Sequence, residues 1–196
     1  MYSSKHNIKP LTHSLGKKIN IIGDGGKSTL AKCISSKFGY DLVELDALFW
    51  LPNWVESTPD DFNRKVSDAI NDTSGEWVVD GNYFGKLNGY VSEKCDTVIW
   101  LELPWKVVFW RLLKRSMLRI ISKELICGGN RESLLSMLNS HHPIQDFFRK
   151  RKSYRSKGER LLSKIPRSVP IIRVTSKEEL NLLYDLHGLR RNSDIY

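Results

Sequence analysis

Short hydrophobic runs rich in Val and Ile alternate with longer amphipathic stretches along most of the chain. Runs of this length that end at turn residues are typical of buried β-strands. Five such runs lie at residues 17–22, 41–45, 76–80, 96–102 and 169–174. Helices are predicted between and after them at residues 28–38, 58–70, 104–121 and 176–186, with two more around Pro143. Strands that each lead into a helix indicate an α/β fold, here a five-stranded parallel sheet with helices on both faces.

The chain also carries signals for where its elements and its domain begin and end. Thr58 followed by Pro59 predicts a helix start, because a hydroxyl caps free N–H groups and proline suits the first helical position. The aromatic stretch 46–54 is predicted to be a loop. No internal repeat or linker divides the chain. We therefore expect one domain over residues 16–188, with flexible tails at 1–15 and 189–196.

Composition and charge narrow the class of protein without deciding it. The chain has 196 residues and a formal net charge of +9, much of it from the basic segment 149–160. Such a segment can bind nucleic acid or a polyphosphate substrate, or it can be a solvated surface. No apolar run approaches the ~20 residues of a membrane span, and the first residues do not resemble a secretory signal. Three widely spaced cysteines without a C-x-x-C pair predict reduced thiols in a cytoplasmic protein.

The candidate chemistry begins at residues 21–31, IIGDGGKSTLA. This segment follows a predicted strand and opens a predicted helix, where free backbone N–H groups and the helix dipole favour an anion. It resembles the phosphate-binding motif G-x-x-x-x-G-K-[ST], but it has two residues fewer between the glycines. In such a loop the lysine neutralises phosphates, and the serine hydroxyl binds Mg²⁺. The candidate nucleotide-binding residues are Gly23, Gly25, Gly26, Lys27, Ser28 and Thr29. The competing interpretation is a glycine-rich turn with an incidental lysine.

Two later features add a candidate metal ligand and a row of cations. Asp80 closes the third predicted strand, where a carboxylate can hold Mg²⁺ through water; the alternative is an Asx turn. Arg111, Arg115 and Arg119 follow one another at four-residue spacing, which places them on one face of a helix. Arginine forms the bidentate phosphate contacts that phosphoryl transfer uses. The alternative for this row is a solvated basic face.

The chain resembles the adenylate-kinase-like P-loop kinases in the order of three motifs. These are the glycine-rich loop, VVDGNY (78–83) and LELPWKVVFWRLLKR (101–115). Within that superfamily the chain resembles the FlaR-like group of DNA topology modulation proteins in three motifs: LDALFW (45–50), WVVDGNY (77–83) and TVIWLELP (97–104). The resemblance covers about residues 17–187 and implies a P-loop NTPase fold with a helical lid at about residues 111–160. In this resemblance, Arg111 and Arg115 match the two arginines at the start of the family's lid segment. Gly128 and Gly129 offer the backbone freedom of a hinge.

The chain departs from the family pattern in the short loop and at Phe84. Phe84 stands where adenylate kinases carry an arginine that contacts the acceptor nucleotide, which argues against AMP as the acceptor. Asp46 ends the second predicted strand, where the resemblance implies contact with the acceptor or its metal. An aspartate there can accept a proton from an attacking hydroxyl or orient it. The aromatic residues that follow, Phe49, Trp50 and Trp54, are either a wall of the acceptor site or part of the core.

Together these features predict an ATP-binding enzyme that transfers a phosphoryl group to a small acceptor, either a nucleotide or another metabolite, with Mg²⁺. The expected roles are donor binding for Lys27 and Ser28, metal binding for Ser28 and Asp80, phosphoryl stabilisation for Arg111 and Arg115, and acceptor contact for Asp46. Two alternatives stay open: a nucleotide-responsive, DNA-associated regulator and a degenerate relative that binds no nucleotide. Because the sequence contains no helix-turn-helix or zinc-finger pattern, we expect only weak, sequence-independent binding of nucleic acid.

Overall fold

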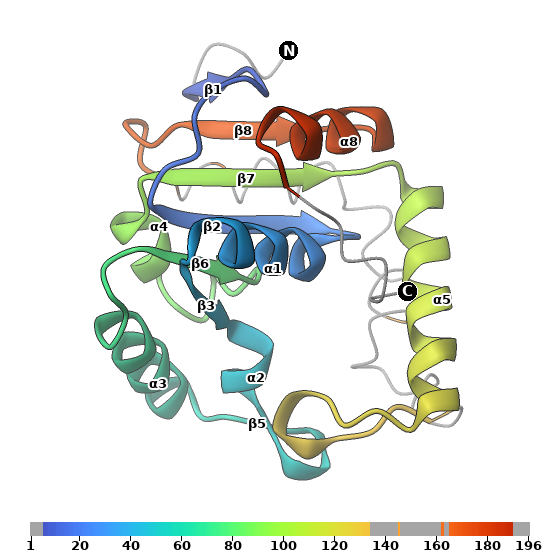
Figure 1. Cartoon of the computed structure of the whole chain (residues 1–196). Helices are drawn as coiled ribbons and strands as arrows, with labels where there is room; N and C mark the ends of the chain where they lie inside the picture. Colours follow the sequence, from blue (N-terminus) through green and yellow to red (C-terminus); the bar gives the residue numbers. More distant parts are fainter. Residues whose placement is uncertain (1–5, 134–144, 146–161, 163–164, 190–196) are drawn as a thin grey trace.

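The computed structural model describes residues 6–133, 145, 162 and 165–189. At its centre is a six-stranded sheet of order β1-β8-β7-β2-β6-β3 (Figure 1). The strands are β1 Ile8–Lys9, β2 Lys18–Asp24, β3 Asp41–Glu44, β6 Trp77–Asp80, β7 Thr97–Glu102 and β8 Ile171–Val174. Every neighbouring pair in this sheet runs parallel. The α/β class and the parallel sheet are therefore confirmed.

The sheet has one strand more than the five predicted. The additional strand, β1, pairs with β8 at the sheet edge, with Ile8 opposite Ile171 and Lys9 opposite Ile172. It lies within residues 1–15, which we expected to be a flexible tail. A strand of two residues has too few positions to show an alternating pattern, so the sequence carries no signal for it. Its place depends on the backbone groups that the edge of β8 offers for pairing.

The long helices agree with the prediction to within a few residues. The helices are α1 Lys27–Phe38, α2 Leu45–Phe49, α3 Pro59–Asn71, α4 Tyr90–Lys94, α5 Trp105–Ser122 and α8 Lys177–Leu186. The predicted start of α3 is confirmed, because Thr58 Oγ1 accepts a hydrogen bond from the N–H of Asp61 at 3.3 Å. Pro59 is the first helical residue, where its missing N–H has no cost.

The stretch 46–54, predicted to be a loop, contains regular structure. It completes α2 and continues into a hairpin of β4 Trp50–Leu51 and β5 Val55–Glu56, joined by the 3₁₀ turn η1 Pro52–Trp54. The reason is burial of an aromatic side chain, because the ring of Phe49 packs against those of Phe62 and Tyr83 at 5.1 and 4.9 Å. That packing fixes a short helix that periodicity alone does not indicate.

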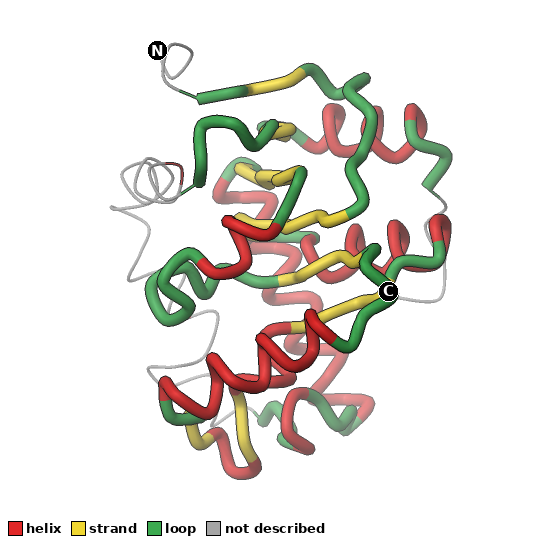
Figure 2. Tube along the Cα trace, turned by 90° about the vertical axis from the view of Figure 1, so that its left-hand side faces the viewer, coloured by secondary structure: helices red, strands yellow, loops and turns green. Residues whose placement is uncertain are grey.

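Two hydrophobic cores lie on opposite faces of the sheet. On β2, Ile19 and Ile21 belong to one core and Ile22 to the other, as the alternation of side chains along a strand requires. The first core is covered by α1 and α8, which lie in front of the sheet in Figure 1, and the second by α3 and α4. In Figure 2 the strands run between helices on either side. The predicted cover of both faces is confirmed.

Helix α5 lies across the carboxyl ends of the strands (Figure 1). It follows β7 directly, with Pro104 before its first turn. This position brings its inner face toward the loop between β2 and α1. Among the described residues, no helix is long and apolar enough to cross a membrane. Most of the predicted lid, including the helices around Pro143 and the basic segment 149–160, lies outside the described residues.

The glycine turn after α5 is packed against the hairpin 50–56, which does not support the hinge predicted there. Gly128 approaches the hairpin so closely that a Cβ would lie 2.3 Å from the carbonyl oxygen of Trp50. The buried side chain of Asn130 donates to the carbonyl of Leu51 at 2.9 Å and accepts from the N–H of Trp54 at 2.9 Å. Trp54 has a positive φ of 59°, which costs a non-glycine residue roughly 1–2 kcal/mol. Gly128 therefore permits close contact of two chain segments.

Candidate functional site

The end of β2 and the loop that joins it to α1 contain glycines in conformations that other residues rarely adopt. Gly23, Gly25 and Gly26 have φ angles of 102°, 80° and 139°. At Gly23 a side chain is excluded, since a Cβ would lie 1.9 Å from the carbonyl oxygen of Leu101 on β7. Gly26, the residue before α1, has no side chain that could cap the N–H groups at the start of the helix. This geometry suits an anion.

Ser28 and Asp80 are brought together, as the predicted metal site requires. Strand β6 lies beside β2 in the sheet, so Asp80 at its end reaches the first turn of α1. Ser28 Oγ donates a hydrogen bond to Asp80 Oδ2 at 2.5 Å. The other oxygen, Asp80 Oδ1, is buried and has no hydrogen-bond partner among the described residues. Hydroxyl and carboxylate oxygens are the ligands that Mg²⁺ prefers, and a buried oxygen without a partner fits such an ion.

The surroundings of Asp80 oppose its ionisation unless a cation is near. Burial raises the pKa of the Asp80 carboxyl; the charge of Lys27 and the bond from Ser28 lower it, and the charges of Asp46 and Glu44 raise it again. Two further carboxylates thus act on Asp80, beside Lys27. A group of like charges favours binding of a divalent cation.

We expect Asp80→Asn to stabilise the metal-free protein at neutral pH. Because the folded pKa of Asp80 is raised, the ionised carboxylate lowers the stability of the fold above that pKa, and this loss disappears as the pH falls through it. Asparagine keeps an acceptor for Ser28 and removes the charge. A gain of about 1 kcal/mol would raise the Tm by about 2–4 °C in a chain of this size. Thermal melts in EDTA from pH 8 to pH 3 measure the difference.

Asp41→Asn is the matched control, because its effect has the opposite sign. Hydrogen bonds from Ser74 lower the pKa of the Asp41 carboxyl, so its contribution to stability is present at neutral pH and is lost in acid. Added Mg²⁺ is expected to stabilise the unmutated protein and Asp41→Asn but not Asp80→Asn. A wild-type Tm above that of Asp80→Asn at pH 8 without metal would contradict the prediction.

The three arginines of α5, predicted to form one row, have three different environments. Arg111 Nη1 donates to the carbonyl oxygen of Gly25 at 2.5 Å. Arg119 Nη1 lies 3.2 Å from the carboxylate of the buried Glu132. Arg115 lies between them, and its buried Nε has no hydrogen-bond partner among the described residues. Burial, and then the charge of Arg119, lower the pKa of Arg115. A guanidinium in such a position gains from an anionic ligand.

Asp46 lies in the first turn of α2 rather than at the end of a strand, because β3 ends at Glu44. Its side chain is exposed, and Oδ1 accepts a hydrogen bond from the Tyr83 hydroxyl at 2.6 Å. Burial, and then the charge of Asp46, raise the pKa of Tyr83, so this hydroxyl stays protonated and donates. The charge of Asp46 also acts on Asp80 and Arg115. The structure therefore connects Asp46 with Asp80 and with the arginine row.

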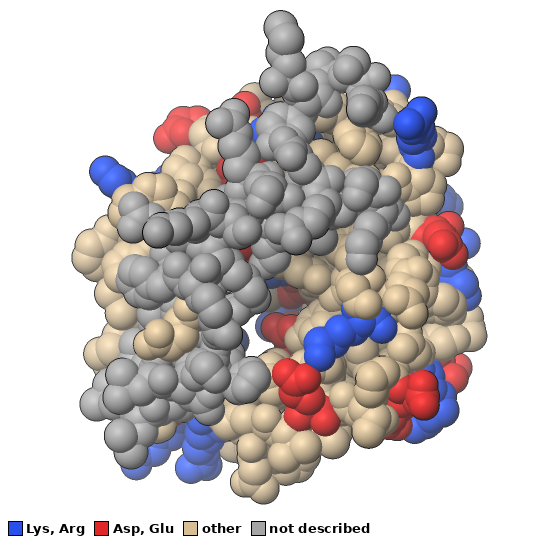
Figure 3. Space-filling model, turned by 180° about the vertical axis from the view of Figure 1, so that it is seen from behind, with Lys and Arg blue, Asp and Glu red and all other residues tan. Residues whose placement is uncertain are grey.

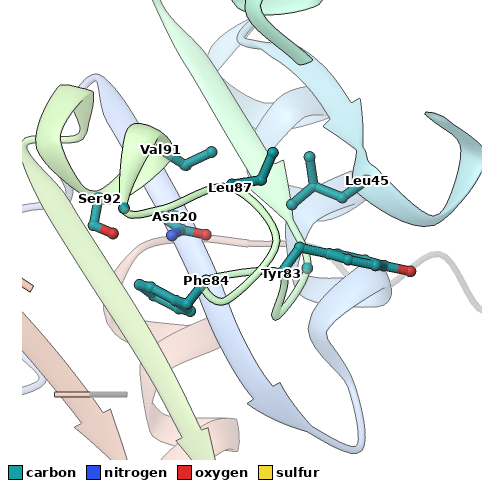
Figure 4. A pocket seen from close by; sticks show the side chains of 9 residues that line it. Asn20, Leu45, Tyr83, Phe84, Leu87, Val91 and Ser92 are labelled. Carbon is teal, nitrogen blue, oxygen red and sulfur yellow. The ribbon is translucent and has the colours of Figure 1, made fainter. Parts of the chain in front are cut away.

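The aromatic residues after Asp46 divide between the two interpretations. Phe49 is 2% exposed and belongs to the core, whereas Trp50 and Trp54 are partly exposed. Phe84 is buried too and lines a cavity with Tyr83 and Asn20 (Figure 4). The space inside is about 10 Å³, whereas small-molecule sites measure about 300–1,000 Å³. This cavity is therefore not a substrate site, and the Tyr83 hydroxyl points away from it in Figure 4.

Two residues at the site were missed by the sequence analysis, Asn82 and Tyr83. Asn82 makes two hydrogen bonds to the backbone of Gly23, and Tyr83 donates to Asp46. Both directly follow Asp80 and Gly81 at the carboxyl end of a buried strand, where ligand-binding residues of parallel sheets gather. That position was the available signal.

Fold and site together define an α/β protein with a candidate site for an anion and a cation at the carboxyl edge of a parallel sheet. Three elements bring the candidate residues to this edge. They are α1 with Lys27, Ser28 and Thr29 in its first turn, β6 with Asp80 and α5 with Arg111. No protein-family model matches the chain, and no curated protein matches it. The assignment of a function therefore depends on the residues of this site.

Proposed function

We propose that this protein is an adenylate-kinase-like P-loop phosphotransferase, which transfers the γ-phosphoryl group of ATP to a small acceptor with Mg²⁺. One observation carries the proposal: the hydroxyl of Ser28 and the buried carboxylate of Asp80 meet beside Lys27 at the N-terminus of α1. A phosphate ester with a bound divalent cation matches the positive helix terminus, the lysine and the two oxygen ligands.

Each residue has a task in the proposed reaction. Lys27 neutralises negative charge on the β- and γ-phosphates, and the N–H groups at the start of α1 bind phosphate oxygens. Ser28 and Asp80 would hold Mg²⁺, which draws charge from the phosphates when bound. Arg115 stabilises the transferring phosphoryl group, and Asp46 orients the acceptor hydroxyl and accepts its proton. Tyr83 donates to one oxygen of Asp46 and so fixes the direction of that carboxylate.

The alternative of a DNA-associated regulator depends on the basic segment 149–160, which lies outside the described residues. On the visible described surface in Figure 3, basic and acidic side chains are interspersed rather than gathered by sign. A mixed surface of this kind does not favour a polyanion such as DNA.

Mg·ATP is expected to raise the melting temperature of the protein. A ligand that binds only the folded state stabilises it by about 2.7 kcal/mol at 100 times its Kd. In a chain of this size that corresponds to roughly 5–10 °C. The measurement is thermal denaturation with Mg·ATP, with Mg²⁺ alone and with ATP in EDTA. A screen of nucleosides, nucleotides and hydroxylated metabolites for transfer of labelled γ-phosphate then identifies the acceptor. No stabilisation at millimolar Mg·ATP would overturn the proposal in favour of a degenerate relative.

A further inference from the structure

The loop between β2 and α1 is held from two sides by side chains that are distant in sequence. Asn82 bonds to Gly23, near the end of β2 where the chain enters the loop, and Arg111 bonds to Gly25 in the loop itself. We infer that these two are positioning residues, which take over the role of the two residues that the loop lacks. The inference rests on the proposed function, because it assigns the loop to phosphate binding. It also separates Arg111 from Arg115, which the sequence analysis placed together as stabilisers of the transferring group.

Asn82 extends the pairing of β2 with β6 beyond the last residue of β6. In that ladder Ile21 lies opposite Asp80, so Gly23 lies opposite position 82. The carboxamide of Asn82 accepts from the N–H of Gly23 at 2.8 Å and donates to its carbonyl at 2.7 Å. The side-chain amide of Asn82 thus makes the two hydrogen bonds to Gly23 that a backbone peptide would make if β6 continued. It fixes the direction of the chain as it enters the loop.

Arg111 holds the loop itself through Gly25. Its Nη1 donates to the carbonyl oxygen of Gly25, and a Cβ on Gly26 would come within 2.9 Å of the same nitrogen. Val108, one turn earlier on α5, is buried and would meet a Cβ of Gly25 at 3.1 Å. The loop is therefore packed against the inner face of α5.

These contacts have a consequence for phosphate binding. A loop of standard length arranges its N–H groups largely by its own turns, whereas this loop has only two residues between β2 and α1. With the carbonyl of Gly25 turned to Arg111, the following N–H groups are fixed at the start of α1. The loop is then ordered before a ligand arrives, so binding does not include the cost of ordering it. Both contacts act on all nucleotides that use the loop, whether or not a γ-phosphate is present.

The test compares the affinities of Mg·ATP and Mg·ADP, measured by calorimetry, for Asn82→Ala, Arg111→Ala and Arg115→Ala. We expect Asn82→Ala and Arg111→Ala each to weaken both nucleotides by about tenfold, because each loses hydrogen bonds that order the loop. Arg115→Ala is expected to leave Mg·ADP binding unchanged, since its proposed partner is the γ-phosphoryl group. Asn63→Ala is the matched control, because its amide also donates to backbone carbonyls, those of Pro59 and Lys86, on an exposed surface.

A second readout follows the loop in the protein without nucleotide. Hydrogen exchange of the Gly23 amide is expected to be slow in the unmutated protein and fast in Asn82→Ala, with other amides of β2 unchanged. Asn82→Asp keeps the acceptor for this N–H but not the donor for the carbonyl. Asn82→Asp should therefore keep the slow exchange of the Gly23 amide but bind nucleotide more weakly. It replaces Asn82→Ala in both measurements if Asn82→Ala does not fold.

The outcomes separate this inference from the proposed function. If the unmutated protein binds neither nucleotide, the proposed function fails and the assignment of the loop to phosphate binding fails with it, whatever the exchange of Gly23. If nucleotides bind but Arg111→Ala weakens only Mg·ATP, Arg111 belongs to the transferring group and its positioning role is overturned. Unchanged affinity and unchanged Gly23 exchange in Asn82→Ala would overturn the role of Asn82.

Discussion

Arg115→Ala is expected to lower phosphoryl transfer on the order of a thousandfold, which corresponds to about 4 kcal/mol of transition-state stabilisation. The reason is the environment of Arg115: its neighbours Arg111 and Arg119 have partners within the protein, whereas its buried Nε has none among the described residues. The melting temperature should change little, because the substitution also removes the unfavourable burial of a charge. Steady-state turnover and thermal melts of the same preparations measure the two effects.

Two further variants show whether charge or shape is responsible for the effect of Arg115. Arg115→Lys keeps the charge but loses the planar fork of donors, so we expect it to recover only a small part of the lost turnover. Arg64→Ala removes an exposed arginine that pairs with Asp61 and Asp68 on α3, and it should retain full turnover. Equal turnover in the unmutated protein, Arg115→Ala and Arg115→Lys would show that Arg115 takes no part in the transfer step.

Lys27→Ala is expected to weaken Mg·ATP binding by at least tenfold and by up to about a hundredfold. A charged hydrogen bond contributes about 1.5–3 kcal/mol, and Lys27 is the first residue of α1, where the proposed site would bind phosphates. Its charge also lowers the pKa of Asp80, so its loss leaves that carboxylate harder to ionise and the proposed metal site weaker. Titration calorimetry with Mg·ATP measures the affinity.

Lys32→Ala is the matched control for Lys27→Ala on the same helix. Lys32 pairs with Glu44 at 3.6 Å on the surface, and such pairs contribute about 0–1 kcal/mol to stability. It should bind Mg·ATP as the unmutated protein does. If both lysine variants retained the same affinity, the loop would be a glycine-rich turn, the interpretation that competes with a phosphate site.

The amino-acid sequence by itself determined most of the secondary structure and the place of the site. It predicted five strands, the four long helices and the Thr58 cap. These features depend on side-chain alternation and capping, which involve only residues close together in the sequence. The loop and Asp80 could be placed at one edge because parallel strands all point their carboxyl ends the same way.

Only the tertiary structure decided how the site residues are connected. The bonds from Asn82 to Gly23 and from Arg111 to Gly25 join residues that are 59 and 86 positions apart. No local pattern distinguishes Arg111 from Arg115, since both lie on one face of a regular helix. Their contacts differ because of where α5 crosses the carboxyl edge of the sheet. Arg111 lies against the loop, and Arg115 lies between Arg111 and Arg119, each of which has a partner of its own. Contacts of this kind depend on strand order and helix docking, and those are properties of the whole chain packing at once.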